Sequence, residues 1–205
     1  MSWLTAITLN TQDISLCGIL DPNQWHQAVW QCFPNVPRAK RDFLLRVNWL
    51  ANGCRVYILS EREPLRPNWC PVDNWAVKEI SSEFLRHKNY YFDLLANPTR
   101  TLVVRDAEGK RVKNGKRIPL YRRNDQLRWL EGKARLHGFS IDANPVVDPA
   151  KKHVFRHKNK RNLVVGVRFR GKLHVTDPRK FIDAFHSGIG RAKAFGFGML
   201  MLQPF

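Results

Sequence analysis

Two apolar segments joined by one tight turn constrain the fold of this chain more than any other feature. Residues 42–49 and 54–60 are rich in Leu, Val, Ile and aromatic side chains, and they flank Ala51-Asn52-Gly53. An Asn-Gly step between two such runs is typical of a β-hairpin, because both residues accept the positive φ angles of the turn. The sequence therefore predicts two adjacent antiparallel strands in the first half of the chain.

The segment before this hairpin predicts one strand and one helix. Residues 3–9 follow the alternating pattern of a half-buried strand. Asp21 and Pro22 then supply an N-cap and a first-turn proline, and a helix is expected to run from there toward Pro34. Its apolar face is predicted to contain Trp25, Val29, Cys32 and Phe33. The first half therefore has the order strand, helix, strand, strand.

The second half of the chain again mixes strands with helices. Helices are expected at 125–136 and, after the cap Asp177-Pro178, up to residue 186. Strands are expected at 90–95, 101–104, 163–169, 172–175 and 199–202, with the third and fourth paired around Arg170-Gly171. The simplest architecture for 205 residues is an α+β chain of two ferredoxin-like modules in tandem. We assign residues 1–88 to the first module and residues 89–205 to the second.

The chain carries a large excess of positive charge. It has 35 Lys and Arg against 17 Asp and Glu, a formal net charge of +18 at pH 7. Such a charge repels itself in the compact state unless a polyanion neutralises it, so nucleic acid is the expected partner. The sequence has no basic amphipathic helix, lipidation signal, basic leader or apolar run of about 18 residues. We therefore expect a cytoplasmic protein without a membrane partner.

Two clusters hold much of the excess charge. A single charged run is usually a solvated face, but two of them in one strongly basic chain favour contact with RNA phosphates. Arginine can in addition pair with guanine. The predicted RNA-binding residues are Lys110, Arg111, Lys113, Lys116, Arg117, Arg122, Arg123 and Arg128 in the first cluster, and Arg156, Lys158, Lys160 and Arg161 in the second.

No metal site or cofactor is expected. His153 and His157 lie four residues apart, a spacing that suits a metal ion only on a helix, and no Cys, Asp or Glu lies nearby to complete a site. The cysteines lie far apart without a Cys-x-x-Cys pair, which argues against a zinc knuckle and a disulfide framework. We expect reduced, mostly structural thiols at Cys17, Cys32, Cys54 and Cys70.

A glycine-rich segment, residues 188–198, precedes the last predicted strand. Its four glycines let the backbone approach a phosphate closely, and two basic side chains supply charge. A dinucleotide site would need G-x-G-x-x-G after a strand and before a helix, whereas the order here is reversed. We predict RNA contacts by Gly188, Gly190, Arg191 and Lys193.

His26 is the first-helix residue whose chemistry is most informative. It lies three residues after Asn23 and four before Trp30, so the three share a face beside the buried stripe. A lone helical histidine is more often a surface or packing residue than a catalyst. The spacing alone therefore favours a structural role for His26.

Taken together, these segments resemble the CasE endoribonucleases of type I-E CRISPR systems, which belong to the repeat-associated RNA-binding protein superfamily. The resemblance spans almost the whole chain. It is carried by the glycine-rich segment 188–200, the histidine-bearing helix 25–34 with its Phe-Pro exit, Arg41-Asp42-Phe43-Leu44, Leu95-Ala96-Asn97-Pro98-Thr99 and Trp129-Leu130.

The resemblance implies an enzyme that grips the stem-loop of a CRISPR repeat RNA and cuts on its 3′ side without metal. A ribose 2′-hydroxyl would attack the adjacent phosphate and leave a 2′,3′-cyclic phosphate and a 5′-hydroxyl. The enzyme would keep its product as a subunit of Cascade and would meet DNA only through that complex. His26 matches the family's catalytic histidine and would transfer a proton as general base or general acid.

Asn23 departs from the family, which often has a tyrosine at this position. Asparagine can orient a group or donate a hydrogen bond, but it is neither an acid nor a base near neutral pH. Either Asn23 has a positional role or the second role lies with Lys151, Lys152 or Arg161, which could stabilise the phosphorane. We take His26, Asn23 and Lys152 as the catalytic residues.

Two other functions fit the same sequence. The first is an RNA-hairpin-binding structural subunit of a Cascade-like complex that has lost cleavage. The second is a DNA-binding structural protein that uses the same positive charge. Competition between an RNA hairpin and duplex DNA would separate them.

Overall fold

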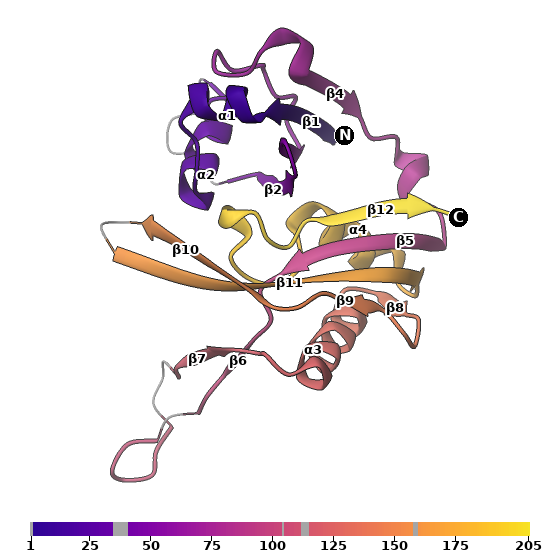
Figure 1. Cartoon of the computed structure of the whole chain (residues 1–205). Coiled ribbons are helices and arrows are strands. Elements are labelled where there is room, and N and C mark those ends of the chain that lie inside the picture. The colour runs from indigo at the N-terminus through magenta and orange to yellow at the C-terminus, as the bar shows by residue number, and fades with distance from the viewer. Residues whose placement is uncertain (1, 35–40, 104, 112–114, 158–159) are drawn as a thin grey trace.

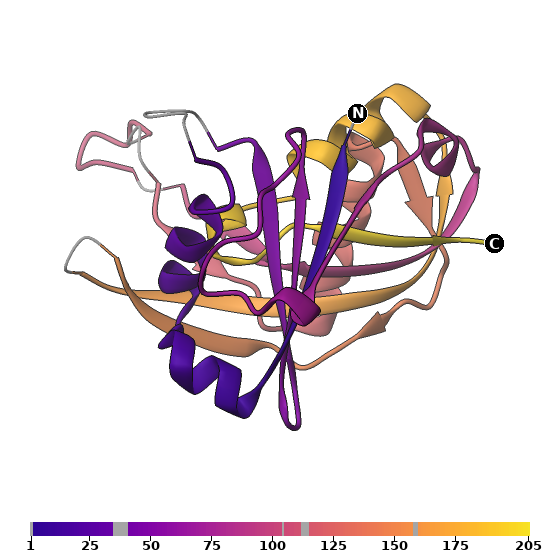
Figure 2. The same ribbon diagram turned by 90° about the horizontal axis from the view of Figure 1, so that it is seen from above.

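The computed structural model describes residues 2–34, 41–103, 105–111, 115–157 and 160–205. Two antiparallel sheets lie in two layers, and the long strands of the second cross beneath those of the first (Figures 1 and 2). The strands of the first sheet lie between residues 3 and 79, and those of the second between residues 89 and 204. We propose residue 88 as the boundary between the two modules.

The first sheet confirms the predicted hairpin and its neighbours. Its order in space is β2 (Phe43–Leu50), β3 (Gly53–Ser60), β1 (Trp3–Asn10) and β4 (Trp75–Glu79), with every neighbouring pair antiparallel. Leu50 pairs with Gly53 across the turn. A Cβ on Gly53, whose φ is 149°, would lie 2.0 Å from the carbonyl oxygen of Leu9, so only glycine fits there.

The helices of the first module follow the cap residues. α2 (Pro22–Trp30) begins after Asp21, whose side chain accepts hydrogen bonds from the backbone N–H groups of Asn23 and Gln24, with Pro22 in the first turn. α2 ends at Trp30, earlier than the expected end near Pro34, but all four predicted apolar residues are buried in the first core, where Cys54 and Cys70 also lie. The sequence reasoning missed α1 (Thr11–Cys17) and the exposed edge strand β4.

The second sheet repeats the strand order of the first. Its four main strands, taken in chain order, again lie in the order second, third, first, fourth, which is that of a ferredoxin-like module. They are β10 (Lys151–His157), β11 (Lys160–Val175), β5 (Asn89–Ala96) and β12 (Leu200–Pro204), and the short strands β8 (Phe139–Ile141) and β9 (Val146–Val147) also pair with β11. Tandem ferredoxin-like modules are thus confirmed.

Helices and turns complete the two modules. The two predicted helices of the second half are confirmed as α3 (Arg123–Leu136) and α4 (Pro178–Ser187), the second capped by Asp177. A separate two-stranded extension, β6 (Thr99–Thr101) and β7 (Arg117–Pro119), projects from the second module (Figure 1). Three short 3-10 turns are η1 (Val72–Asn74), η2 (Ser82–Leu85) and η3 (Lys193–Phe195).

Two strand predictions were wrong. Arg170-Gly171 is not a turn, because both residues lie within the single strand β11 and pair with Asp93 and Phe92 of β5. The unbroken ladder with β5 holds this segment extended. The strand expected at 101–104 is β6, which begins at Thr99 and ends at Thr101, and Val104 lies outside the described residues.

Alternation along β2 joins the two modules. Phe43 and Leu45 belong to the core beneath α2, whereas Leu44 belongs to the core of the second module. Since neighbouring side chains on a strand point to opposite faces, Arg46 shares the face of Leu44 and points toward the second module. The strand that packs against the His26 helix therefore also forms the junction between the modules.

Candidate active site and nucleic-acid interface

His26 lies on α2 at the place where the two modules meet. It is partly exposed, and its ring lies 5.8 Å from the ring of Phe43 on β2 and 6.2 Å from that of Trp30. The indole N–H of Trp30 donates a hydrogen bond to His26 Nε2 at 3.2 Å. Nε2 is therefore an acceptor in this arrangement, and proton transfer through Nε2 requires this hydrogen bond to open.

Asn23 lies one turn before His26 and shares its face. Its backbone N–H is tied to the cap carboxylate of Asp21 at 2.8 Å, so the cap fixes this turn of the helix. Asn23 is partly exposed. The structure thus brings Asn23 and His26 together on α2, as the spacing predicted.

The glycine-rich segment packs against the His26 helix. η3, which lies in its middle, contacts both α2 and β2. The segment is closed by a hydrogen bond from Ile189 N–H to the carbonyl of Gly198 at 2.8 Å, and a Cβ on Gly198 would lie 2.6 Å from the carbonyl oxygen of Ile189. Close backbone approach therefore explains at least one of the four glycines without any ligand.

The predicted RNA contacts of this segment divide into two kinds. Gly188 is buried, and a Cβ on it would lie 2.8 Å from a methyl carbon of Leu44, so it serves packing. Gly190 is partly exposed, and it lies against the indole of Trp129. Arg191 is exposed, and Lys193 Nζ donates a hydrogen bond to the carbonyl of Ser187 at 2.9 Å. The two basic residues are the better candidates for an RNA contact.

The second sheet has two chemically different faces at β11. The face that carries Gly166 and Arg168 is directed toward the first module, since Gly166 lies against His153 and Phe197 and Arg168 binds Asp93. The opposite face carries Phe169, whose ring stacks on Trp129 of α3 with centroids 6.0 Å apart. Side chains of β11 therefore alternate between the His26 side and the α3 side.

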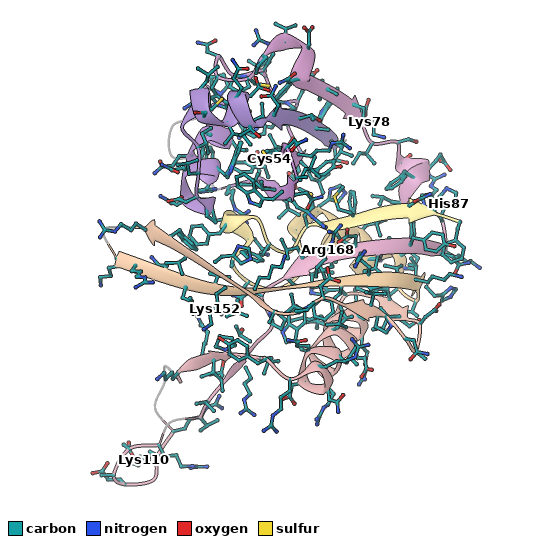
Figure 3. All side chains as sticks on the ribbon, viewed as in Figure 1. Cys54, Lys78, His87, Lys110, Lys152 and Arg168 are labelled. Atoms are coloured by element: carbon teal, nitrogen blue, oxygen red, sulfur yellow. The ribbon has the colours of Figure 1, made fainter. Side chains whose placement is uncertain are left out.

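Lys152 belongs to the α3 side of the sheet. It pairs with Val165, which shares the face of Phe169, whereas its neighbour His153 packs against Phe197 on the opposite side. Figure 3 shows Lys152 directed from β10 toward the extension that carries Lys110. The structure therefore does not bring Lys152 together with His26, in contrast to what the sequence suggested.

The second basic cluster is a β-hairpin. Arg156 and Arg161 are exposed and face one another across β10 and β11, on the same side as Lys152. Lys160 is exposed and lies on the other face. Because 151–157 is a strand, the helical spacing considered for the two histidines does not exist. Lys158 lies outside the described residues.

The first basic cluster extends from the two-stranded extension to the start of α3. All of its described basic side chains are exposed, and Lys110 lies near the tip of the extension (Figure 3). Arg123 donates a hydrogen bond to the carbonyl of Pro145, and Arg128 pairs with Asp125 at 3.4 Å. Lys113 lies outside the described residues; the others are Lys110, Arg111, Lys116, Arg117, Arg122, Arg123 and Arg128.

Metal ligands do not gather in the described ranges. No group of three or more His, Cys, Asp or Glu side chains there has the arrangement of a metal site. Burial raises the pKa of Cys32 to about 12, and the nearby Cys70 adds to this effect, so this thiol stays protonated. Among the residues that the structure describes, no helix is long and apolar enough to cross a membrane.

Comparison with known proteins identifies the family. A family model described as "CRISPR associated protein" matches residues 2–204. The Cascade subunit CasE of Escherichia coli K12 is 31% identical over 188 residues, which cover 90% of this chain and 92% of the relative. The chain belongs to the CasE family of CRISPR-associated proteins.

Further CasE relatives match over nearly their full lengths. The CRISPR-associated endoribonuclease Cse3 of Thermus thermophilus is 23% identical over 98% of this chain and 100% of its own. The crystal structure of Cas6e from E. coli K-12 superposes with a TM-score of 0.72 at 28% identity, covering 100% of both chains. A structure of Cse3 bound to a 19-nucleotide RNA gives a TM-score of 0.80 at 23% identity, covering 98% and 100%.

A buried ion pair holds the two modules together. Arg46, whose side chain is only 1% exposed, donates hydrogen bonds to the carboxylate of Asp93 at 2.7 Å and to its carbonyl oxygen at 2.9 Å. Arg168 binds the same carboxylate with its Nε at 3.0 Å. Burial raises the pKa of Asp93, but the Arg168 hydrogen bond and the Arg46 charge outweigh it and leave that pKa below its ordinary value. We call these residues the junction triad.

Sequence reasoning missed one basic residue near His26 and another on α3. The guanidinium of Arg41 lies 6.0 Å from the centre of the Phe43 ring, the same ring that His26 contacts, and it donates to the carbonyl of Phe43 at 2.9 Å. Lys133 of α3 lies 5.9 Å from the centre of the Trp129 ring. Arg41 ends the short basic run Arg38-Ala39-Lys40-Arg41, and Lys133 lies outside the two basic clusters, so sequence reasoning singled out neither.

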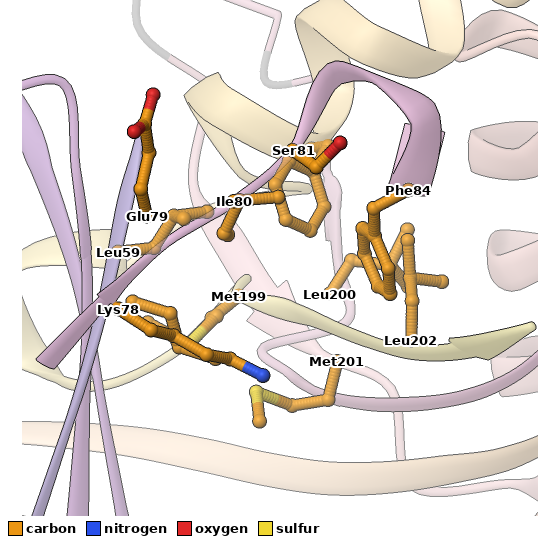
Figure 4. A pocket seen from close by; sticks show the side chains of 12 residues that line it. Leu59, Lys78, Glu79, Ile80, Ser81, Phe84, Met199, Leu200, Met201 and Leu202 are labelled. Atoms are coloured by element: carbon orange, nitrogen blue, oxygen red, sulfur yellow. The ribbon is translucent and has the colours of Figure 1, made fainter. Parts of the chain in front are cut away.

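An apolar pocket of about 300 Å³ lies away from this site. It opens between β4 of the first sheet and β12 of the second, and Figure 4 shows Lys78 and Glu79 at its edge beside Ile80, Phe84 and Met201. None of the residues predicted to bind RNA or to catalyse lines it. A phosphodiester substrate needs cations and proton donors, and these lie on the His26 and α3 sides instead.

Proposed function

We propose that this chain is a metal-independent endoribonuclease that cuts CRISPR precursor RNA on the 3′ side of the repeat stem-loop. The products would be a 2′,3′-cyclic phosphate and a 5′-hydroxyl, and the protein would stay bound to the mature RNA as a Cascade subunit in the cytoplasm. The observation that carries this proposal is the position of His26, on the helix that packs against the glycine-rich segment at the module junction.

Proton transfer by His26 is the chemical core of the proposal. A metal-free transesterification needs one group to take the proton of the 2′-hydroxyl and one to protonate the departing 5′-oxygen. An imidazole can do either near neutral pH. Asn23, one turn earlier on the same face, can orient the ribose or the phosphate through its amide, but it cannot exchange a proton.

The basic face of the second module is the proposed stem-binding surface. Lys152, Arg156 and Arg161 lie on the side of the β10–β11 hairpin that faces α3. The extension with Lys110, Lys116 and Arg117 lies on that side as well (Figure 3). A structured RNA is recognised mainly through shape and backbone, which suits a surface with many exposed cations.

The proposal is tested with repeat RNA and purified protein in a chelator. We expect cleavage to continue, and His26→Ala to slow it by about 10²–10⁴-fold while affinity for the hairpin changes little. His174→Ala is the matched control, because His174 is exposed and bonds Asn89 of the second module. Cleavage that needs magnesium, or that survives unchanged in His26→Ala, contradicts the proposal.

A structural subunit without cleavage is the second candidate, and Asn23 is the observation that favours it. If the family's tyrosine role is essential, this chain would bind the hairpin and leave it intact. The same assay separates the two functions, since the structural subunit predicts tight binding and no product. Asn23→Tyr would then be expected to restore cutting.

A further inference from the structure

We propose that Arg41, Lys133 and Lys193 form a phosphate-binding site for the RNA strand that leaves the hairpin, and that they lead this strand across the module junction to His26. We call these three residues the junction cations. The inference rests on the proposed RNA substrate, and it adds a site for the single-stranded segment that is separate from the stem-binding surface.

Three different elements bring the junction cations together. Lys193 lies in the glycine-rich segment, which packs on α2 and β2 through η3. Gly190 of the same segment lies against the indole of Trp129, with a Cβ position 3.2 Å from a ring carbon, and Lys133 extends over that same ring. Arg41 precedes β2 and is anchored on Phe43. The segment therefore connects α3 with the start of β2.

The junction cations extend from one face of the second sheet to the other. Lys133 comes from α3, on the side where Lys152 and Arg161 lie. Arg41 contacts the Phe43 ring, which His26 contacts as well, on the side of the first module. A strand that leaves a stem on the α3 side can reach His26 by passing Lys133, then Lys193, then Arg41.

The charge of this site lacks an internal counterion. In the described ranges no carboxylate forms an ion pair with Arg41, Lys133 or Lys193, whereas four other arginines of the second module and its junction, Arg46, Arg128, Arg168 and Arg170, pair with Asp side chains. All three junction cations are partly buried. Partly buried like charges destabilise a protein unless a ligand neutralises them.

Electrostatic effects within the site agree with its geometry. Burial lowers the pKa of Lys193, and the charges of Arg41 and Lys133 lower it further. Burial also lowers the pKa of His137, at the end of α3, and Lys133 and Lys193 add to that effect. These groups therefore repel one another across the space between α3, the glycine-rich segment and β2. A backbone phosphate there would relieve the repulsion.

The test compares two RNAs that cannot be cut because the ribose at the cleavage position lacks its 2′-hydroxyl. One contains the hairpin and its 3′ single-stranded segment, and the other ends with the stem. Arg41→Gln/Lys133→Gln/Lys193→Gln should bind the longer RNA at least tenfold more weakly than wild type and the shorter one equally well. The salt slope for the longer RNA should fall by about 0.7 for each phosphate that the variant no longer neutralises.

Single uncharged methylphosphonate linkages in the 3′ segment locate the contact. At the contacted linkage the substitution should weaken binding to wild type and leave binding to the triple variant unchanged. Lys78→Gln on the exposed strand β4 is the matched control, and it should behave as wild type. Equal weakening with both RNAs in the triple variant, or methylphosphonate effects that are the same in wild type and variant at every linkage, would overturn the site.

Melting without RNA tests whether the junction cations are structural. Because the substitutions remove mutual repulsion, the melting temperature of the triple variant should equal or exceed that of wild type. A lower melting temperature would assign these residues to the fold and overturn the proposal. Binding is measured without cleavage, so the result remains valid even if the chain proves not to cut RNA. If wild type cuts RNA but binds the two RNAs equally well, this inference is wrong and the proposed function is unaffected.

Discussion

The module junction holds two groups of basic residues that differ in how their charge is balanced. In the junction triad, the carboxylate of Asp93 lies between Arg46 and Arg168 and binds both. Of the junction cations, Arg41 precedes β2, Lys133 lies on α3 and Lys193 lies in the glycine-rich segment, and the described part of the chain provides no ion pair for any of them. The protein itself supplies a carboxylate that offsets part of the charge of the first group, and the second group is left for a ligand.

This difference teaches how a chain with a net charge of +18 can fold and still bind RNA. A buried arginine without a counterion destabilises the folded state strongly, so Arg46 needs Asp93. The junction cations are partly exposed, so water screens their repulsion and its cost to the folded state stays small enough for the protein to fold without a phosphate. Charges with a structural role should therefore control stability, and charges with a binding role should control affinity.

The largest expected effect is on stability. Asp93→Asn leaves Arg46 buried without a counterion, and we expect it to lower the free energy of unfolding by about 3 kcal/mol. Urea denaturation measures this change. Asp148→Asn is the matched control, because the pair of Arg170 with Asp148 is 46% and 32% exposed, and its removal should cost less than about 1 kcal/mol. Equal effects of the two substitutions would erase the distinction between the triad and surface pairs.

Acid should reproduce part of that destabilisation in the wild type. The pKa of Asp93 is lower in the folded state than its ordinary value, so its contribution is complete above the ordinary value of about 4 and disappears as the pH falls through the lower, folded pKa. The difference in unfolding free energy between wild type and Asp93→Asn should therefore shrink below about pH 4. A difference that stays constant down to pH 2 would show that Asp93 acts through something other than its charge.

RNA should stabilise the wild type more than the variant that lacks the junction cations. At an RNA concentration of about 100 times Kd, binding adds about 2.7 kcal/mol to the stability of a protein, and a tenfold weaker variant at the same concentration gains about 1.4 kcal/mol. Thermal melting with the uncleavable longer RNA measures the two shifts. Asp148→Asn should keep the full shift, since its ion pair takes no part in this site. Equal shifts in wild type and the triple variant would show that the cations do not meet the RNA.

Local signals in the sequence predicted the elements that hold the candidate site. Asp21-Pro22 and Asp177-Pro178 begin helices at the expected residues, and Asn52-Gly53 forms the expected hairpin, because caps and turns depend on the backbone of a few neighbouring residues. The helical spacing that put Asn23, His26 and Trp30 on one face is also confirmed. These features needed no knowledge of the rest of the chain.

Long-range contacts decided the features that the sequence did not reveal. Gly171 suggested a turn, but pairing with β5 keeps β11 straight through it. Residues 151–157 form β10, yet their many charges led the sequence analysis to treat them only as a basic cluster. Arg41 and Lys133 are separated by about half the chain and meet only through the glycine-rich segment. No local pattern carries that information.

The smallest expected effect concerns the basic extension and separates it from the junction cations. Lys116 and Arg117 are exposed, so Lys116→Ala/Arg117→Ala should leave the free energy of unfolding within about 0.5 kcal/mol of wild type. If both residues touch stem phosphates, the salt slope of binding should fall by up to about 0.9 for each, and it should do so for the RNA that ends with the stem. Stems of different sequence should be affected nearly alike, because phosphate contacts carry no base information.

The control for the basic extension is Lys78→Ala/Lys88→Ala, which removes two exposed charges elsewhere and should leave the slope unchanged. A slope that falls only for the longer RNA would place the extension on the single-stranded segment instead, and an unchanged slope with both RNAs would return these residues to a solvated surface.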